Sequence, residues 1–211
     1  RRAFTETERW SYKSDRYTFN DIIVEPPVVQ KPHPPMWVGA ASEGSIRGAA
    51  RNGYNLLLAQ VPSFEAIAES VNFYRDELDQ MGEPFDPYRI AVTRGMMVAN
   101  NDAERAEAHV LRGKFLTEVQ VLATDPRFQS KTFVPAARHK NRGDPTETSE
   151  AGAIIGNSEE MIERIERLYE IGVRDVALHD LSGNFDALEQ FAEEVMPHFA
   201  DRDDDTVKAA E

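Results

Sequence analysis

The stretch Pro34-Pro35-Met36-Trp37-Val38-Gly39-Ala40-Ala41-Ser42-Glu43-Gly44-Ser45 decides how this chain is expected to fold. Its apolar run, 36–38, has no polar member, which is typical of a strand buried on both faces. The small residues 39–41 then leave the backbone open to the close approach of a ligand. Ser42 follows at the N-cap position of a helical pattern that ends at Gly53.

A strand that leads through small residues into a helix N-terminus predicts an anion site, because unpaired amides and the helix dipole both favour negative charge there. Phosphate is the anion that such sites most often bind. A plain strand-to-helix turn, in which Ser42 and Ser45 serve only as caps, fits the same residues. The local sequence leaves both interpretations open.

The composition limits the classes of partner. The 211 residues are 41% hydrophobic and 29% charged, as in ordinary globular proteins. A net charge of −13 argues against nucleic acid or an anionic membrane as partner. The absence of cysteine excludes disulfides and zinc-thiolate sites and suits a cytoplasmic location. The chain begins with Arg1 rather than Met, so we expect it to be part of a longer polypeptide.

Residues 1–35 are expected to form the tail of a helix, an extended arm and a Pro-rich connector, and residues 36–200 the main domain. In that domain, strands and helices alternate. Capping boxes are expected at Asn157 with Glu160 and at Asp186 with Glu189. Strands are expected at 36–40, 54–59, 89–99 and 173–179, and helices at 43–52, 63–81, 102–122, 157–171 and 186–199.

The segment 123–153 breaks this alternation. It contains three prolines and a basic cluster that includes Arg138 and His139. A segment of this length without regular structure predicts either a lid over a site or a disordered loop. The acidic tail 201–211 is expected to be disordered.

Apolar strands separated by helices imply a parallel sheet with right-handed crossovers. A doubly wound sheet and part of an eight-stranded barrel both fit this order. In either fold the functional site lies at the carboxyl ends of the strands, where Gln60 and His179 would lie near Ser42.

Five segments closely resemble the C-terminal half of the bacterial luciferase-like flavin-dependent monooxygenases. The Pro-rich segment is the most specific of them, and the resemblance covers nearly all of residues 10–200. The segments are PVVQKPHPPMWVG (27–39), AARNG (49–53), IGNSEEM (155–161), GVRDVAL (172–178) and EEVMP (193–197).

The resemblance implies a (β/α)8 TIM barrel, of which about the last four β/α units are present, with 36–40 as the fifth strand and 173–179 as the eighth. It also implies a site for reduced FMN, or for a deazaflavin as in some branches. The family's phosphate contacts fall on Ala41, Ser42 and Ser45, and the small residues Gly39 and Ala40 complete the predicted cofactor site. Ala41 replaces a carboxylate present in bacterial luciferase.

We therefore expect a flavin-dependent oxidoreductase, a monooxygenase that uses reduced FMN and dioxygen on a small organic substrate, with most of the chemistry supplied by the cofactor. The substrate or lid residues are predicted to be Gln60, Arg138, His139 and His179. Each also has a structural interpretation, as a hydrogen-bonded wall residue for His179 and as part of a solvated loop for Arg138 and His139. The sequence assigns no catalytic acid or base and no metal site.

The first four strands of such a barrel have no counterpart here, which predicts either a missing amino-terminal half or a homo-oligomer. Two other classes of function remain. One is a non-catalytic flavin- or phosphate-binding half-barrel or assembly scaffold, and the more distant one is a metal-dependent barrel hydrolase.

Overall fold

The computed structural model describes residues 1–124 and 144–200. They form two compact units, which divide after Trp37. The helices are α1 (Arg2–Thr5), α2 (Glu43–Arg51), α3 (Phe64–Met81), α4 (Asp102–Thr124), α5 (Pro145–Gly152), α6 (Ser158–Ile171) and α7 (Phe185–Gln190). The strands are β1 (Trp10–Lys13), β2 (Thr18–Ile22), β3 (Trp37–Gly39), β4 (Asn55–Leu58), β5 (Ile90–Val98), β6 (Ile154–Gly156) and β7 (Asp175–Asp180).

The first unit holds a two-stranded antiparallel hairpin, β1 and β2, where the sequence predicted an extended arm. The turn depends on Ser14, whose hydroxyl accepts hydrogen bonds from the backbone N–H groups of Arg16 and Tyr17, at 3.4 and 3.1 Å. The ring of Phe19 contacts the rings of Trp10 and Tyr12 across the hairpin and that of Tyr17 on its own side. Alternation over four or five residues was too short a signal to reveal this pairing.

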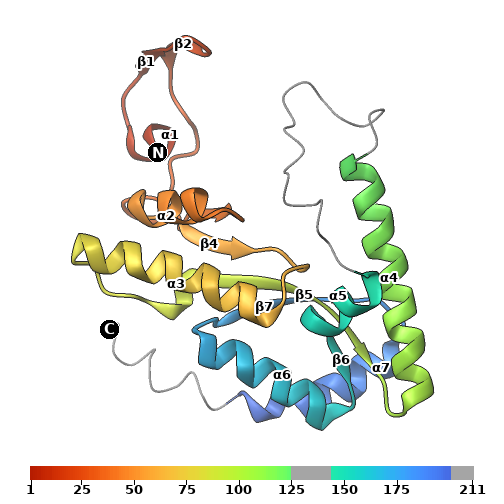
Figure 1. The fold of residues 1–211 in the computed structure, drawn as a ribbon. Helices are drawn as coiled ribbons and strands as arrows, with labels where there is room; N and C mark the ends of the chain where they lie inside the picture. Colours follow the sequence, from red (N-terminus) through yellow and green to blue (C-terminus); the bar gives the residue numbers. More distant parts are fainter. Residues whose placement is uncertain (125–143, 201–211) are drawn as a thin grey trace. The chain divides into compact units, whose positions relative to one another are not determined.

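The second unit is built on a five-stranded sheet in which β5 is the central strand (Figure 1). Three strands run parallel to β5: β4 beside Ile90–Val92, β7 beside Ala91–Met96 and β6 beside Met96–Val98. The expected parallel α/β architecture is confirmed. β6 was not expected, because three apolar residues next to a helix cap give no periodic signal.

Side chains alternate between the two faces of the sheet. On one face, Ile90, Val92 and Met96 of β5 join the main apolar core together with residues of α2, α3 and α6. Neighbouring positions, such as Thr93 and Gly95, belong to the other face, which we call the inner face. In Figure 1, α4 runs down the right side, across the direction of α3 and α6.

Most predicted helix ends are correct. The Asn157–Glu160 capping box is present, and Gly172 ends α6 in the left-handed conformation that glycine adopts without strain, at a φ of 103°. The Asp186 box is wrong: Asn184 caps α7 by accepting a hydrogen bond from the Asp186 N–H at 3.0 Å. The expected single helix also breaks after Gln190 into a π turn and a 3-10 turn, as Pro197 has no N–H to continue it.

The expected insertion 123–153 is partly helical. Its residues 145–152 form α5, which Asp144 caps by accepting hydrogen bonds from the N–H groups of Thr146 and Glu147. Residues 125–143, which include Arg138 and His139, and the tail 201–211 lie outside the described residues.

We expect Asn157→Ala to lower the free energy of unfolding by about 1 kcal/mol, because the N–H of Glu160 loses its capping acceptor. Urea denaturation followed by circular dichroism measures the change. Glu163→Ala, at an exposed position of the same helix, is the control and should shift the value by less than about 0.5 kcal/mol. Equal effects of the two substitutions would contradict the assigned role of Asn157.

Candidate functional site

The carboxyl ends of β3 and β4, together with Thr93 in the middle of β5, surround an open hollow of about 290 Å³. A Cβ atom added to Gly39 would meet nothing within 4 Å, so the space beside this strand end is empty of protein atoms. The hollow is lined by Gly39, Ala40, Ala41, Leu57, Leu58, Ala59 and Thr93. Three of the predicted cofactor residues therefore lie together on its wall.

The other two predicted cofactor residues, Ser42 and Ser45, form a capping box at the start of α2. The Ser45 N–H donates to Ser42 Oγ at 3.1 Å, and the Ser42 N–H donates to Ser45 Oγ at 3.0 Å. Two of the amides expected to hold a phosphate are thus already bonded within the chain. No hydrogen bond among the described residues uses the N–H of Glu43 or Gly44. The two serine hydroxyls are also bonded within the box, because Ser45 Oγ donates to Ser42 O at 2.9 Å and lies 2.7 Å from Ser42 Oγ. The groups left for the predicted anion site are therefore the amides of Glu43 and Gly44.

Beside the hollow, Arg112 of α4 lies across the inner face of β5. The position of its guanidinium requires Gly95, because a Cβ there would lie 1.9 Å from Arg112 Nη1. Arg112 donates to Gln60 through Nη2, at 2.8 Å from the backbone oxygen, and through Nη1, at 3.3 Å from Oε1. The structure thus brings the predicted site residue Gln60 against an arginine that sequence analysis did not single out.

His179, another predicted site residue, lies on the same face. It is the register partner of Gly95 on the neighbouring parallel strand β7. The ring of Phe115, one turn after Arg112 on α4, makes an edge contact with the imidazole at 5.7 Å between centroids. The described part of α4 therefore covers the inner face with one cation and one aromatic ring.

A second arginine, Arg94 of β5, is buried on the opposite side of the strand against the ring of Phe64. Both Arg94 and Arg112 are 0% exposed, and no carboxylate of the described residues lies within 4 Å of either guanidinium. Arg94 Nη1 donates to Ala59 O at 3.3 Å, whereas Arg94 Nε, Arg94 Nη2 and Arg112 Nε have no hydrogen-bond partner among the described residues. Burial, and secondarily the charge of Arg112, lower the pKa of Arg94 to about 10, so it remains a cation at neutral pH.

Sequence reasoning missed both arginines. Arg94 left a signal, since it is the one charged residue in the strand 90–98. Arg112 left none, because it is one of many charged residues on a long helix. Arg138 and His139 cannot be placed, as they lie outside the described residues.

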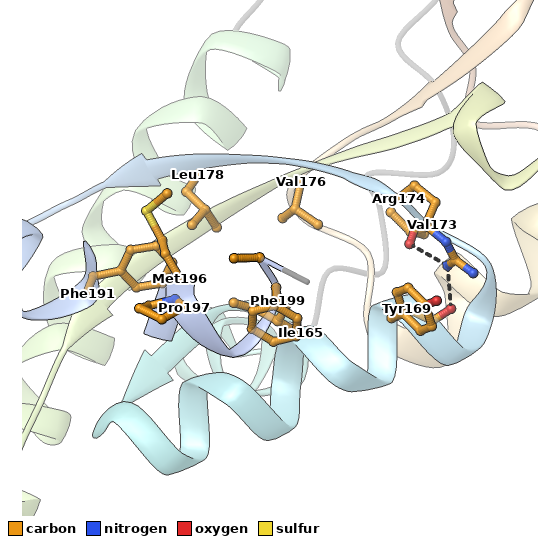
Figure 2. A pocket seen from close by; sticks show the side chains of 11 residues that line it. Ile165, Tyr169, Val173, Arg174, Val176, Leu178, Phe191, Met196, Pro197 and Phe199 are labelled. Atoms are coloured by element: carbon orange, nitrogen blue, oxygen red, sulfur yellow. Dashed lines mark hydrogen bonds between the residues drawn. The ribbon is translucent and has the colours of Figure 1, made fainter. Parts of the chain in front are cut away.

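A larger apolar cavity of about 740 Å³ lies on the outer side of β7 (Figure 2). Val176 and Leu178 point into it from β7 and Ile165 from α6, while Arg174 at its edge donates to the backbone oxygens of Tyr169 and Val173. Because Val176 and Leu178 alternate with His179 along the strand, this cavity opens on the face opposite to the predicted site.

The two helices that flank residues 125–143 are joined by a buried hydrogen bond between His109 Nδ1 and Ser149 Oγ, at 2.9 Å. His109 is 6% exposed. Burial lowers the pKa of this imidazole, opposed by the charge of Glu150 and reinforced by nearby arginines, which include Arg164 and Arg112.

Within residues 1–124 and 144–200, no helix has the length and apolar character needed to cross a membrane. The same residues hold no group of three or more His, Cys, Asp or Glu side chains placed to bind a metal ion.

A sequence profile of the luciferase-like monooxygenases matches residues 1–175. The chain therefore belongs to the luciferase-like monooxygenase family. A search of curated protein sequences finds no match.

Three solved structures illustrate the fold. The monooxygenase RslO1 from Streptomyces bottropensis has a TM-score of 0.70 at 20% identity, over 94% of this chain and 58% of its own. An F420-dependent secondary alcohol dehydrogenase in complex with an F420-acetone adduct has a TM-score of 0.66 at 15% identity, over 92% and 57%. The 3,6-diketocamphane monooxygenase of Pseudomonas putida, in complex with FMN, has a TM-score of 0.63 at 15% identity, over 90% and 58%.

At these identities the likeness shows the fold alone. The chain spans 57–58% of the length of these three structures, and together with its parallel sheet this identifies the second unit as a partial (β/α)8 barrel. The barrel alternative of the sequence analysis is thereby confirmed over the doubly wound sheet.

We expect Arg94→Met to leave the free energy of unfolding unchanged or to raise it by about 1–4 kcal/mol. The substitution replaces a buried charge, with no carboxylate within 4 Å among the described residues, by an apolar side chain of similar length, and it removes only one long hydrogen bond, to Ala59 O at 3.3 Å. Arg164→Met is the matched control: Arg164 donates to the backbone oxygens of Glu150 and Ala153, so its loss should destabilise the protein. Urea denaturation measures both, and a larger loss for Arg94→Met would refute this account of Arg94.

We expect stability to decline as the pH falls below about 6.5, the ordinary pKa of histidine, and His109 to cause part of that decline. Its pKa is lower in the folded protein, so the unfolded chain takes up the proton first and gains free energy relative to the folded state. His109→Gln, which keeps a polar side chain without a titrating group, should lose less stability between about pH 8 and pH 5.5. Urea denaturation at each pH measures the free energy of unfolding, and an equal loss in the two proteins over this pH range would rule this out.

Proposed function

We propose that this chain supplies the cofactor-binding half of a flavin-dependent oxidoreductase, a monooxygenase that uses reduced FMN and dioxygen on a small organic substrate. The observation that carries the proposal is the hollow at the ends of β3 and β4 and beside Thr93 of β5, next to a helix N-terminus with two amides available. Membership in the luciferase-like monooxygenase family supports it. So do the FMN and F420 bound in two proteins of similar fold, and F420 is accordingly the alternative cofactor.

The residues present fit such a cofactor. Gly39, Ala40 and Ala41 carry no bulk that would exclude a flat ring or its phosphate tail, and the hydroxyls of Ser42 and Ser45 lie beside the amides of α2. Leu57 and Thr93 give the hollow an apolar floor with one hydroxyl. When bound, a reduced flavin supplies the electrons that monooxygenation requires.

Gln60 and His179 are proposed as walls of the substrate region. They lie on the strand ends beyond the hollow, on the β4 and β7 sides of β5 respectively. We retain Arg138 and His139 as proposed lid residues from the sequence alone. The remaining strands of the barrel would come from another segment of the polypeptide or from a second copy of this chain.

A non-catalytic flavin- or phosphate-binding half-barrel is the second candidate. It is favoured by the fraction that the chain covers of the length of these structures, 57–58%, and by the lack of an assigned catalytic acid or base among its residues. Both candidates require flavin binding, and only the first requires oxidation of a substrate.

We expect Gly39→Leu to weaken FMN binding by about tenfold or more, because the new side chain would fill the hollow. Fluorescence titration of the protein with FMN, repeated with F420, measures the affinity. Gly48→Ala is the matched control: a Cβ there also meets nothing within 4 Å, but Gly48 lies inside α2, away from the hollow, so affinity should not change.

Binding of neither FMN nor F420 by the unsubstituted protein would overturn both candidate functions. Binding that Gly39→Leu leaves intact would overturn the assigned site. Oxygen consumption with reduced FMN and a panel of organic substrates then separates the two candidates, since the non-catalytic one predicts binding without substrate oxidation.

A further inference from the structure

We propose that Arg112 binds the carboxylate or sulfonate group of an organic acid, which is the substrate, on the inner face of β5 beside the flavin hollow. The term substrate rests on the function proposed above, whereas the anion site itself does not. Two buried arginines, Arg94 and Arg112, leave positive charge unbalanced: both are 0% exposed and face no carboxylate among the described residues. Buried charges in proteins are normally paired, because an unpaired one loses its hydration without compensation.

The arginines have a structural role, which does not account for all their donors. Arg94 and Arg112 hold the loop after β4 through the backbone oxygens of Ala59 and Gln60. Neutral carbonyl groups satisfy some N–H donors but do not offset two positive charges. On Arg112, Nε has no hydrogen-bond partner among the described residues. An anionic ligand on the inner face would offset the charge of Arg112 and accept from its guanidinium, whereas Arg94 lies on the opposite face of the strand.

Gln60 marks the place where a ligand oxygen would bind. Its Oε1 lies 3.3 Å from Arg112 Nη1, a long hydrogen bond, and its side chain is half-buried while Arg112 is buried behind it. Rotation of one glutamine side chain would therefore open the guanidinium. Replacement of a neutral amide oxygen by an anionic one converts a weak hydrogen bond into a charge-assisted one.

The surroundings suit the rest of such a ligand. Thr93, which lines the hollow, precedes Gly95 by two residues on the same face, which places the hollow about 7 Å from the strand position that Arg112 covers. The ring of Phe115 and the imidazole of His179 stand on the other side of Arg112 and offer an apolar and a polar wall. A small acid with its charged end on Arg112 would thus lie next to the proposed cofactor.

The test uses the 211-residue chain without added flavin, titrated calorimetrically with hexanoate, with 1-hexanesulfonate and with the neutral analogue hexanamide. Both anions should bind and hexanamide should not. Arg112→Gln should weaken hexanoate binding by about tenfold or more. Gly95→Ala should also weaken it, since the new Cβ would displace the guanidinium without removing the charge. Arg105→Gln, on the same helix but paired with Glu160, is the control and should bind hexanoate normally.

A second readout does not depend on variants. In the unsubstituted protein, the Arg112 Nε–H signal in the nitrogen–proton NMR spectrum should shift on addition of hexanoate and not of hexanamide, because an anion that replaces Gln60 Oε1 on Nη1 changes the electrostatic environment of the same guanidinium. This measurement also serves if Arg112→Gln fails to fold. Equal binding of hexanoate and hexanamide, equal affinities in all variants, or an unchanged Nε–H signal would each overturn the proposal.

FMN titration of the same samples keeps the two proposals separate. Arg112→Gln should retain the FMN affinity of the unsubstituted protein, because the cofactor residues lie on β3 and α2. Failure of FMN to bind, together with hexanoate binding that depends on Arg112, would remove the flavin function and leave the anion site standing. FMN binding without hexanoate binding would remove the anion site and leave the flavin function standing.

Discussion

The whole second unit depends on the pairing of β5 with parallel strands on both of its sides. This strand holds β4, β6 and β7, its alternate apolar side chains join the core with α2, α3 and α6, and its other face carries Thr93 and Gly95 beneath the candidate site. Such a strand has no solvent-facing side, so any polar residue on it must find partners inside the protein. Arg94 meets this requirement only in part, because Nη1 donates to Ala59 O while Nε and Nη2 have no hydrogen-bond partner among the described residues.

Gly95 connects this packing constraint with the chemistry of the site. Any side chain at that position would occupy the space of the Arg112 guanidinium, so the absence of a Cβ on the central strand allows a helix 17 residues further along to place a cation on the sheet. The same guanidinium then fixes the loop after β4 through Gln60. The strand, the loop and α4 are thus coupled by one side chain.

The parts of the fold that the sequence predicted are those with local causes. The strand at 89–99, the Asn157 cap and the stop at Gly172 follow from periodicity and from backbone conformations that few residues adopt. The β1–β2 hairpin, the three-residue β6 and the contact of Arg112 with Gln60 depend on partners distant in sequence or on segments too short to show a period. The small residues of the hollow could be predicted from the sequence, because a ligand site at a strand end requires little bulk. The sequence did not show that the N–H groups of Ser42 and Ser45 donate to each other's hydroxyl oxygens.

The order of the strands also separates the proposed cofactor residues from the proposed substrate residues on the inner face. The cofactor residues belong to β3 and to α2, which follows it, whereas Arg112, Phe115 and His179 gather over β5 and β7. Strands lie about 4.8 Å apart, so the two groups are separated by about 10–14 Å, enough for a ring and a small substrate side by side. In this chain of net charge −13, a buried cation beside the hollow gives an organic anion a local attraction that the protein as a whole does not. Binding selectivity at this face would therefore come from a single desolvated guanidinium rather than from overall charge.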